Sequence, residues 1–202
     1  MDSFARGISF PRIAGLGYFG PPTSTRLLVN PLKAIVLTAS AIAALGFLAP
    51  ERFVMPVEGA SRNDYNSKSY WYYPWGKSVT HKGVDVFAKR GTPVVASVSG
   101  LVVAAGERGP GGKFVVVLGP KWRVHYFAHL HTIDTAPGTW VTRGERIGSV
   151  GDSGNAKGKS PHLHFSIGTL VPYPWRIDDG PHGFRKMWYL DPTPRLDAAT
   201  AR

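Results

Sequence analysis

The sequence predicts a mostly β protein, with a single antiparallel β-sheet domain that follows an apolar N-terminal segment. Glycine and proline supply 24 and 17 of the 202 residues, which favours turns and short elements over long helices. Short runs rich in valine, isoleucine and aromatic residues recur between turn signals, and no window of residues 81–170 has a helical period. Hydrophobic residues make up 43% of the chain, which excludes a fully disordered protein.

The N-terminal quarter differs from the rest in composition. Residues 1–33 carry four basic residues against one acidic residue, with several prolines and glycines, and predict a basic, disordered, cytoplasmic head. Residues 34–50 predict a transmembrane anchor or a signal segment, because Ala34–Ala49 has no charge and Pro50 ends it. The run is shorter than the ~20 residues of a spanning helix and longer than the ~7–15 of a signal core. The long basic stretch before it favours a retained anchor, and its lack of a polar face disfavours a buried core helix.

The strands are expected where β-branched and aromatic residues cluster. Turn signals such as Gly109–Gly112 and Pro137-Gly138 separate them. Because no helices intervene, strands at this spacing are expected to pair antiparallel. The runs are Val94–Val98, Leu101–Ala105, Phe114–Leu118, Arg123–Leu130, Arg146–Val150 and His162–Ile167.

Charge and cysteine content limit the chemistry of the chain. The formal net charge of +11 favours an anionic partner such as nucleic acid, phospholipid or an acidic wall polymer. The sequence has no cysteine, which excludes disulfides, thiolate zinc sites, iron–sulfur clusters and cysteine nucleophiles. Any metal must therefore be held by histidine, aspartate or glutamate. All seven histidines lie between His81 and His182, so the chemistry is expected after residue 50.

Two short strings carry candidate metal ligands. In an extended strand, side chains two and four residues apart share a face. His81 and Asp85 can therefore point to the same side, with Gly83 leaving the space between them empty, and His162 and His164 can do the same. Imidazole nitrogens and carboxylate oxygens are suitable zinc ligands, and two histidines with one aspartate leave a fourth position for water, as in catalytic sites.

A third string, His125–His131, offers further imidazoles. On one continuous strand, His125, Phe127, His129 and His131 would share a face, and the spacing does not say which of them reaches the same site. For each histidine the alternative is a core or surface imidazole with a satisfied hydrogen bond.

These strings resemble those of the lysostaphin/LytM-type zinc endopeptidases, which cut the peptide bridges of bacterial peptidoglycan. The resemblance runs from about Phe53 to Leu196 and implies a fold of the duplicated-hybrid-motif type. The segments that match family elements, in chain order, are His81–Val86, Gly91–Ala96, Ser99–Val102, Phe127–Leu130, Val141–Gly154, Pro161–Phe165 and Tyr189–Pro192.

The resemblance implies a role for five residues of a zinc peptidase domain at 51–202. Position by position, it implies the zinc ligands His81, Asp85 and His164, with Zn²⁺ as the cofactor. It also implies that His129 and His162 are a catalytic pair that orients or deprotonates the attacking water without binding the metal.

The implied substrate is a peptide cross-link or stem peptide of peptidoglycan, and nucleic acid is not expected because no recognised binding motif appears. The implied location is the cell envelope: membrane-anchored with the catalytic domain outside the cytoplasm, or secreted if the N-terminal segment is cleaved.

The sequence departs from the family pattern at several points. Phe127 stands where tyrosine is commoner, and Ser166 where glutamate is frequent. The link before His81 is unusually long, and its aromatic residues between Tyr65 and Trp75 predict either a self-packed loop or a wall of the substrate groove. The alternative function is a catalytically silent peptidoglycan-binding or hydrolase-activating module of the same fold. The presence of all five functional residues disfavours that alternative.

Overall fold

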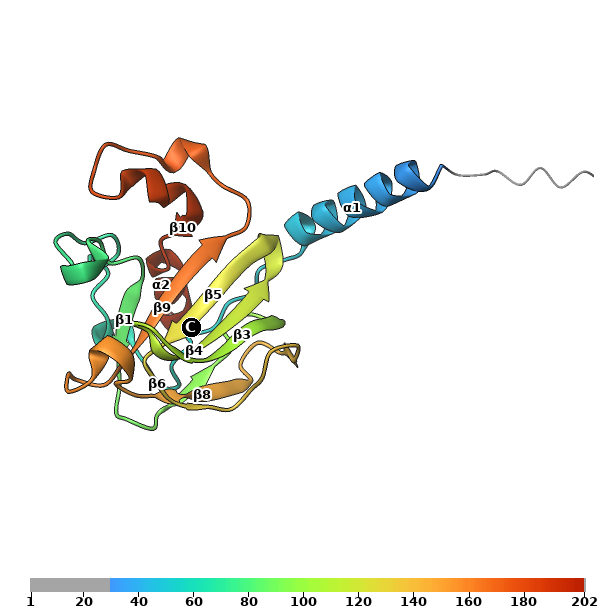
Figure 1. Ribbon diagram of the computed structural model, residues 1–202. Helices are drawn as coiled ribbons and strands as arrows, with labels where there is room; N and C mark the ends of the chain where they lie inside the picture. The colour runs from blue at the N-terminus through green and yellow to red at the C-terminus, as the bar shows by residue number, and fades with distance from the viewer. Residues whose placement is uncertain (1–29, 202) are drawn as a thin grey trace, which may run out of the picture.

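The structure is a computed structural model that describes residues 30–201 (Figure 1). Most of the expected basic head, residues 1–29, lies outside the described residues, so its disorder and cytoplasmic location stay predictions.

An apolar helix, α1, begins three residues before the expected segment and spans Pro31–Leu48. The side chain of Asn30 accepts a hydrogen bond from the backbone N–H of Leu32, and the proline stands in the first turn, where its missing N–H costs nothing. None of the 18 helix residues is buried, and Figure 1 shows α1 projecting from the β domain. Its length and composition suffice to cross a membrane.

The rest of the described chain is a β domain in which every strand pairing is antiparallel, as the sequence predicts. The strands divide between two sheets: one has the order β1-β9-β5-β4-β3-β7, with β10 also paired to β9, and the other has the order β2-β8-β6. The strands are β1 Val84–Phe87, β2 Pro93–Val95, β3 Gly100–Arg108, β4 Gly112–Gly119, β5 Arg123–Ala128, β6 Leu130–Ile133, β7 Trp140–Val141, β8 Arg146–Val150, β9 His162–Thr169 and β10 Tyr189–Leu190.

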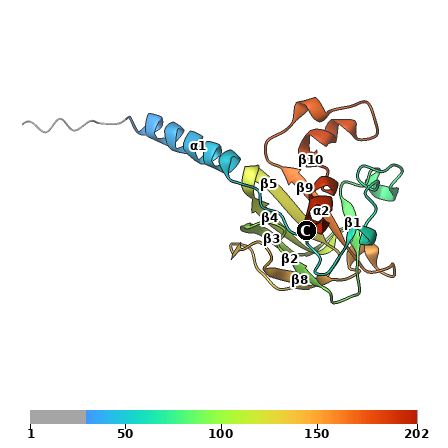
Figure 2. The same cartoon turned by 180° about the vertical axis from the view of Figure 1, so that it is seen from behind.

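Short helical elements connect the strands. A C-terminal α-helix that the sequence analysis did not predict lies in front of the larger sheet in Figure 2, and its Leu196 is buried in the core. The helical elements after α1 are the 3₁₀ turns η1 Arg62–Asp64, η2 Gly76–Ser78, η3 Pro120–Trp122, η4 Gly154–Ala156, η5 Pro174–Arg176 and η6 Gly183–Trp188, and the helix α2 Thr193–Thr200.

One apolar core takes side chains from both sheets. Phe127, Leu163 and Phe165 contribute from the larger sheet, and Leu130 and Ile147 from the smaller one, all fully buried. Burying side chains of this size stabilises the fold by about 1.5–3 kcal/mol each. Since neighbouring residues on a strand face opposite sides, this core turns the alternate residues of β9 toward the other face of the sheet.

The predicted strand Arg123–Leu130 is wrong in one respect, because it breaks at His129. That residue has a φ of 62°, in the left-handed region, so β5 ends at Ala128 and β6 joins the other sheet. His125 and Phe127 face the core as alternation predicts, but His129 turns to the opposite face. The expected common face of the four residues is therefore not formed.

His125 lies in the core as a neutral imidazole. It is fully buried, with its Nδ1 atom 3.0 Å from the Ser97 hydroxyl. Burial, and then the charges of Arg195 and Arg123, lower its pKa to about 3. As pH falls through about 6.5, the unfolded chain gains a proton on this residue and the folded chain does not. The free energy of unfolding therefore decreases as pH falls below about 6.5.

We therefore expect His125→Gln to make the protein less sensitive to acid. Because glutamine does not titrate, the variant should lose about 2 kcal/mol less unfolding free energy than the parent between pH 7 and pH 5. Urea unfolding of both proteins in detergent at the two pH values measures the difference. Equal losses would contradict the neutral, buried state of His125.

Candidate metal centre

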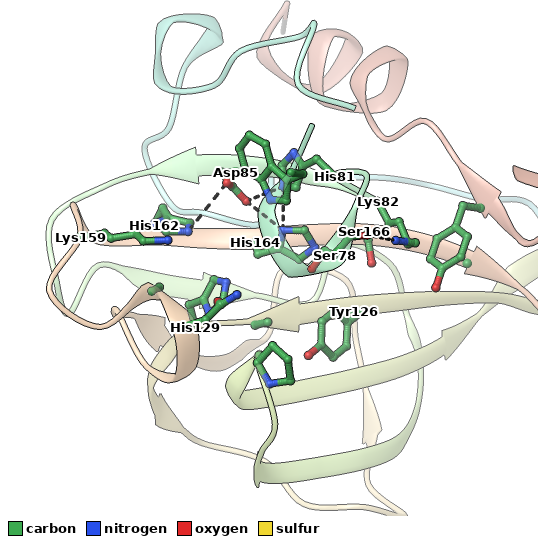
Figure 3. Close-up of a pocket in the computed structure, with 18 of the residues that line it drawn as sticks. Ser78, His81, Lys82, Asp85, Tyr126, His129, Lys159, His162, His164 and Ser166 are labelled. Atoms are coloured by element: carbon green, nitrogen blue, oxygen red, sulfur yellow. Dashed lines mark hydrogen bonds and ion pairs between the residues drawn. The ribbon is translucent and has the colours of Figure 1, made fainter. Parts of the chain in front are cut away.

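Three predicted ligands meet at one end of the larger sheet (Figure 3). The pairing of β1 with β9 sets Asp85 directly opposite His164, and His81 lies just before β1. The His81 Nε2 atom lies 3.0 Å from the Asp85 Oδ1 atom and 3.0 Å from the His164 Nδ1 atom, which is itself 2.9 Å from the same carboxylate oxygen. His81 and Asp85, which are close together in the sequence, thus meet His164, which lies 79 residues after Asp85.

The donor set fits a zinc ion. Ligands held tetrahedrally at about 2.0–2.2 Å lie about 3.3–3.6 Å from one another, which is close to the spacing of these three atoms. The Nδ1–H of His81 donates to the Ser69 carbonyl at 3.0 Å, which holds the ring with Nε2 facing Asp85 and His164. Two imidazoles and one carboxylate leave a fourth position for water or substrate.

The protonation states of His164 and Asp85 also suit a zinc ion. Burial lowers the pKa of His164, which keeps the imidazole in the neutral form that binds metals. Burial alone would raise the pKa of Asp85, but its hydrogen bonds to His164 and His81 outweigh that effect and hold the pKa well below its usual range. The site therefore presents an anionic carboxylate at Asp85 and a neutral imidazole at His164 at neutral pH.

Gly83, between the first two ligands, has no room for a side chain. A Cβ atom on Gly83 would lie 2.5 Å from the Phe165 carbonyl oxygen and 2.9 Å from the Nε2 atom of His164. This is consistent with the empty space that the sequence analysis expected between His81 and Asp85, and the crowding groups are the backbone of β9 and the ring of His164.

We expect Gly83→Ala to weaken zinc binding and to destabilise the domain, because the new methyl group must displace His164 or separate β1 from β9. The cost should be about 1–3 kcal/mol, as for other overpacked positions. The matched control is Gly106→Ala on β3, where an added Cβ meets nothing within 4 Å. Thermal unfolding and zinc content measure both effects, and equal behaviour of the two variants would contradict the close packing.

The two remaining predicted residues, His129 and His162, lie beside the three donors with their rings 5.0 Å apart. The Nδ1–H of His129 donates to the Ser153 carbonyl at 2.9 Å, and that of His162 donates to the Ser160 carbonyl at 2.8 Å. Both rings are thereby held in the tautomer that leaves Nε2 free as a proton acceptor. The Nε2 atom of His162 lies 3.9 Å from the Oδ2 atom of Asp85.

His129 reaches this position through a strained backbone. Its left-handed conformation is uncommon for a residue other than glycine and costs of order 1–3 kcal/mol. Its backbone N–H donates to the Gly111 carbonyl at 2.9 Å, which ties the turn to the neighbouring loop. Burial, and then the charges of His164 and His162, lower its pKa to about 4. His129 is therefore neutral at pH 7 and able to accept a proton.

All five predicted residues line one cavity of about 860 Å³. One of its walls is Trp75, whose ring stacks on His81 with the ring centroids 4.2 Å apart. Tyr65, at the other end of the aromatic loop, is buried in the core and donates a hydrogen bond to Asp197 at 2.6 Å. One end of the loop thus packs on the core and the other lines the cavity, and its role as a wall of the substrate groove stays a prediction.

The sequence analysis did not single out Tyr126, which lines the cavity from β5. Its position could have been predicted from the sequence, because it stands between His125 and Phe127, and a strand residue between two core-facing residues faces the other side of the sheet. His131, by contrast, lies exposed beside Arg90, with its Nδ1 atom 3.0 Å from the guanidinium. It does not line the cavity.

Comparison with known proteins places the chain in a family. Residues 79–172 match the model of peptidase family M23. The L-Ala--D-Glu endopeptidase of Bacillus subtilis (strain 168) is 33% identical over 160 residues, which are 75% of this chain and 44% of that protein. Lysostaphin of Staphylococcus simulans is 37% identical over 108 residues, 51% of this chain and 21% of that protein. The chain therefore spans less than half the length of these curated relatives.

A solved structure gives the same result. The catalytic domain of lysostaphin from Staphylococcus simulans superposes with a TM-score of 0.52 at 30% sequence identity, over 66% of this chain and 93% of that domain. The lysostaphin-like fold that the sequence implies is thereby confirmed. Since the family model spans all five clustered residues and the structural match covers 93% of a solved catalytic domain at 30% identity, the chain belongs to peptidase family M23.

Proposed function

We propose that this chain is a zinc-dependent endopeptidase that hydrolyses peptide cross-links or stem peptides of bacterial peptidoglycan. One observation carries the proposal: three clustered donors and two correctly oriented, non-ligand histidines line the same cavity. The relatives support the substrate class, since their names include a peptidoglycan DD-endopeptidase of Vibrio cholerae and an L-Ala--D-Glu endopeptidase. The net charge of +11 suits an anionic wall polymer.

In this proposal His81, Asp85 and His164 hold the zinc ion. Zinc bound there would act as a Lewis acid that polarises a carbonyl group and lowers the pKa of a water molecule toward ~7. The largely buried carboxylate of Asp85 supplies the one negative charge among the three ligands. The Ser69 carbonyl fixes the His81 ring, and Trp75 covers one face of that ring.

The two other histidines move protons. His129 and His162 each present Nε2 to the cavity, so either one can accept a proton from the attacking water and return it to the leaving amine. The low pKa of His129 keeps that ring neutral and ready to accept a proton at pH 7. Because backbone carbonyls hold both Nδ1–H groups, the rings keep the same orientation throughout.

The proposal includes a location. The helix α1 would anchor the chain in the membrane, with the domain at residues 51–202 outside the cytoplasm, where peptidoglycan lies. Cleavage after the helix would instead release a secreted enzyme. The apolar surface of α1 supports membrane insertion in either case, because none of the helix residues is buried by the described part of the chain.

The experiment is digestion of purified peptidoglycan by the full chain in detergent, with and without a zinc chelator. Mass spectrometry of the released fragments names the bond and separates a direct cross-link from a glycine bridge. We expect chelator-sensitive loss of cross-linked fragments. A chain that binds zinc and peptidoglycan without cutting would be the silent module instead, and a chain with neither zinc nor cleavage would overturn the metal centre.

A further inference from the structure

The anchor helix contacts the β domain at the η3 turn. The indole N–H of Trp122, in the η3 turn between β4 and β5, donates to the Ala43 carbonyl of α1 at 3.0 Å. The ammonium group of the neighbouring Lys121 donates to the Phe47 carbonyl at 3.4 Å. The turn thus bonds to two carbonyls in the C-terminal half of the helix.

Two further features show that the helix and the turn are closely packed. A Cβ atom on Gly46 would lie 2.3 Å from the indole ring of Trp122, so glycine is required for the ring to come this close to the helix. Both Lys121 and Trp122 adopt positive φ, 61° and 55°, which is strained for residues other than glycine. Strain of this kind persists only where surrounding contacts hold the backbone in place.

The chain between helix and domain is too short and too firmly held to act as a flexible tether. Only Ala49 and Pro50 separate α1 from Glu51, whose side chain is 9% exposed. Its carboxylate pairs with Arg123 at the start of β5 and, at 3.1 Å, with Arg195 of α2. The domain is therefore joined to α1 by an ion-pair cluster on one side and the Trp122 turn on the other.

The length of α1 sets the depth of the turn. A span needs about 17–25 residues, and the apolar residues Leu27, Leu28 and Val29 precede the helix in the sequence, so a span that begins at Leu27 is long enough by Ala43. Ala43 is then about 8 Å from the end of the helix at Leu48. With the span ending there, a side chain bonded to Ala43 lies at the border of the lipid, where tryptophan is favoured and lysine extends its charge to the headgroups.

The surface next to the turn is also apolar. The backbone N–H of Leu170, just after β9, donates to the Trp122 carbonyl at 2.9 Å. The side chains of Leu170 and Val171 are 56% and 36% exposed. Figures 1 and 2 both show the β4–β5 turn and the end of β9 at the end of the domain from which α1 projects. These side chains extend the apolar surface of the helix onto the domain.

We propose that the β4–β5 turn and Leu170 sit in the interfacial layer of the membrane, so that the domain lies docked on the lipid surface instead of hanging from a tether. The inference rests on the proposed membrane anchor. β5 leads from the turn to the active site, and the seven residues from Trp122 to His129 cover at most about 23 Å. The enzyme would therefore act only on peptidoglycan peptides close to the membrane.

The test uses the absence of cysteine from the chain. Leu170→Cys carries an environment-sensitive fluorophore at the proposed lipid contact, and Lys157→Cys, in the exposed loop that precedes β9 at its other end, carries it as the control. The full chain is reconstituted in phosphatidylcholine–phosphatidylglycerol vesicles that contain a lipid with a quencher near the headgroup. We expect several-fold stronger quenching at position 170 than at position 157.

A second variant tests the cause of the docking. Gly46→Leu places a side chain where the Trp122 ring lies, so it should reduce quenching at position 170 while the chain still floats with the vesicles. Equal, weak quenching at positions 170 and 157 in floating vesicles would overturn the docked arrangement, and so would a chain that does not float. Hydrolysis of soluble peptidoglycan fragments by the same variants in detergent reports on the enzyme separately, and Gly46→Leu is expected to leave it unchanged.

Discussion

Replacing Asp85 by asparagine is expected to remove zinc from the protein and to abolish peptidoglycan hydrolysis while the β domain stays folded. The Oδ1 atom of Asp85 contacts both His81 and His164, so the substitution removes the only negative charge from the three donors and keeps their shape. Removing a residue that only hydrogen-bonds to a metal ligand lowers metal affinity about 10–100-fold, so removing this ligand itself should lower it more than ~100-fold. Competition with a fluorescent chelator measures the affinity.

A matched surface substitution serves as the control. Asp134 pairs with Arg146 at 2.7 Å on the exposed side of the smaller sheet, and Asp134→Asn should leave zinc affinity and hydrolysis at the parent level. Normal zinc content in Asp85→Asn would contradict its role as a ligand. Loss of zinc in both variants would show that the effect arises from the fold and not from the site.

His162→Ala and His129→Asn are expected to retain zinc and to lose most of the activity. Neither residue belongs to the three clustered donors, yet each presents Nε2 to the cavity, and positioned proton transfer contributes about 10²–10⁴-fold to rate. Asparagine is chosen at position 129 because it tolerates the left-handed backbone found there. The measurements are kcat on soluble peptidoglycan fragments and zinc content by mass spectrometry.

The control for the histidine pair is His131→Ala. His131 belongs to the same short string as His129, but it lies exposed beside Arg90 outside the cavity, so its loss should leave kcat unchanged. Loss of zinc from His162→Ala would instead make His162 a ligand. Full activity in His129→Asn would assign all proton transfer to His162.

Much of the candidate centre is predictable because strand geometry is local. The alternation of side chains along a strand places Leu163 in the core and His162 and His164 on the opposite face, as the structure has them. The alternation also predicts a small residue at Gly83, although Gly83 lies before β1 and the groups that crowd it are the backbone of β9 and the His164 ring. The antiparallel β class follows from the regular spacing of turn signals, since each turn is encoded by a few adjacent residues.

The sequence could not assign the role of His129 from its spacing. Continuous alternation would place it with His125 in the core, and only the resemblance to a family separated the two residues. The backbone leaves the strand there because the chain must cross from the larger sheet to the smaller one, and non-glycine residues take positive φ only when tertiary contacts hold them. No local pattern of residues encodes such a break.

By itself, then, the sequence determined the antiparallel β class, the apolar segment and the residue types available for a metal, because each depends on neighbours a few positions apart. Only the tertiary structure decided that Asp85 lies opposite His164, that Trp75 covers His81 and that Trp122 rests on α1. These contacts join parts of the chain that are distant in sequence. They depend on strand register and on the packing of the whole core, which local periodicity does not specify.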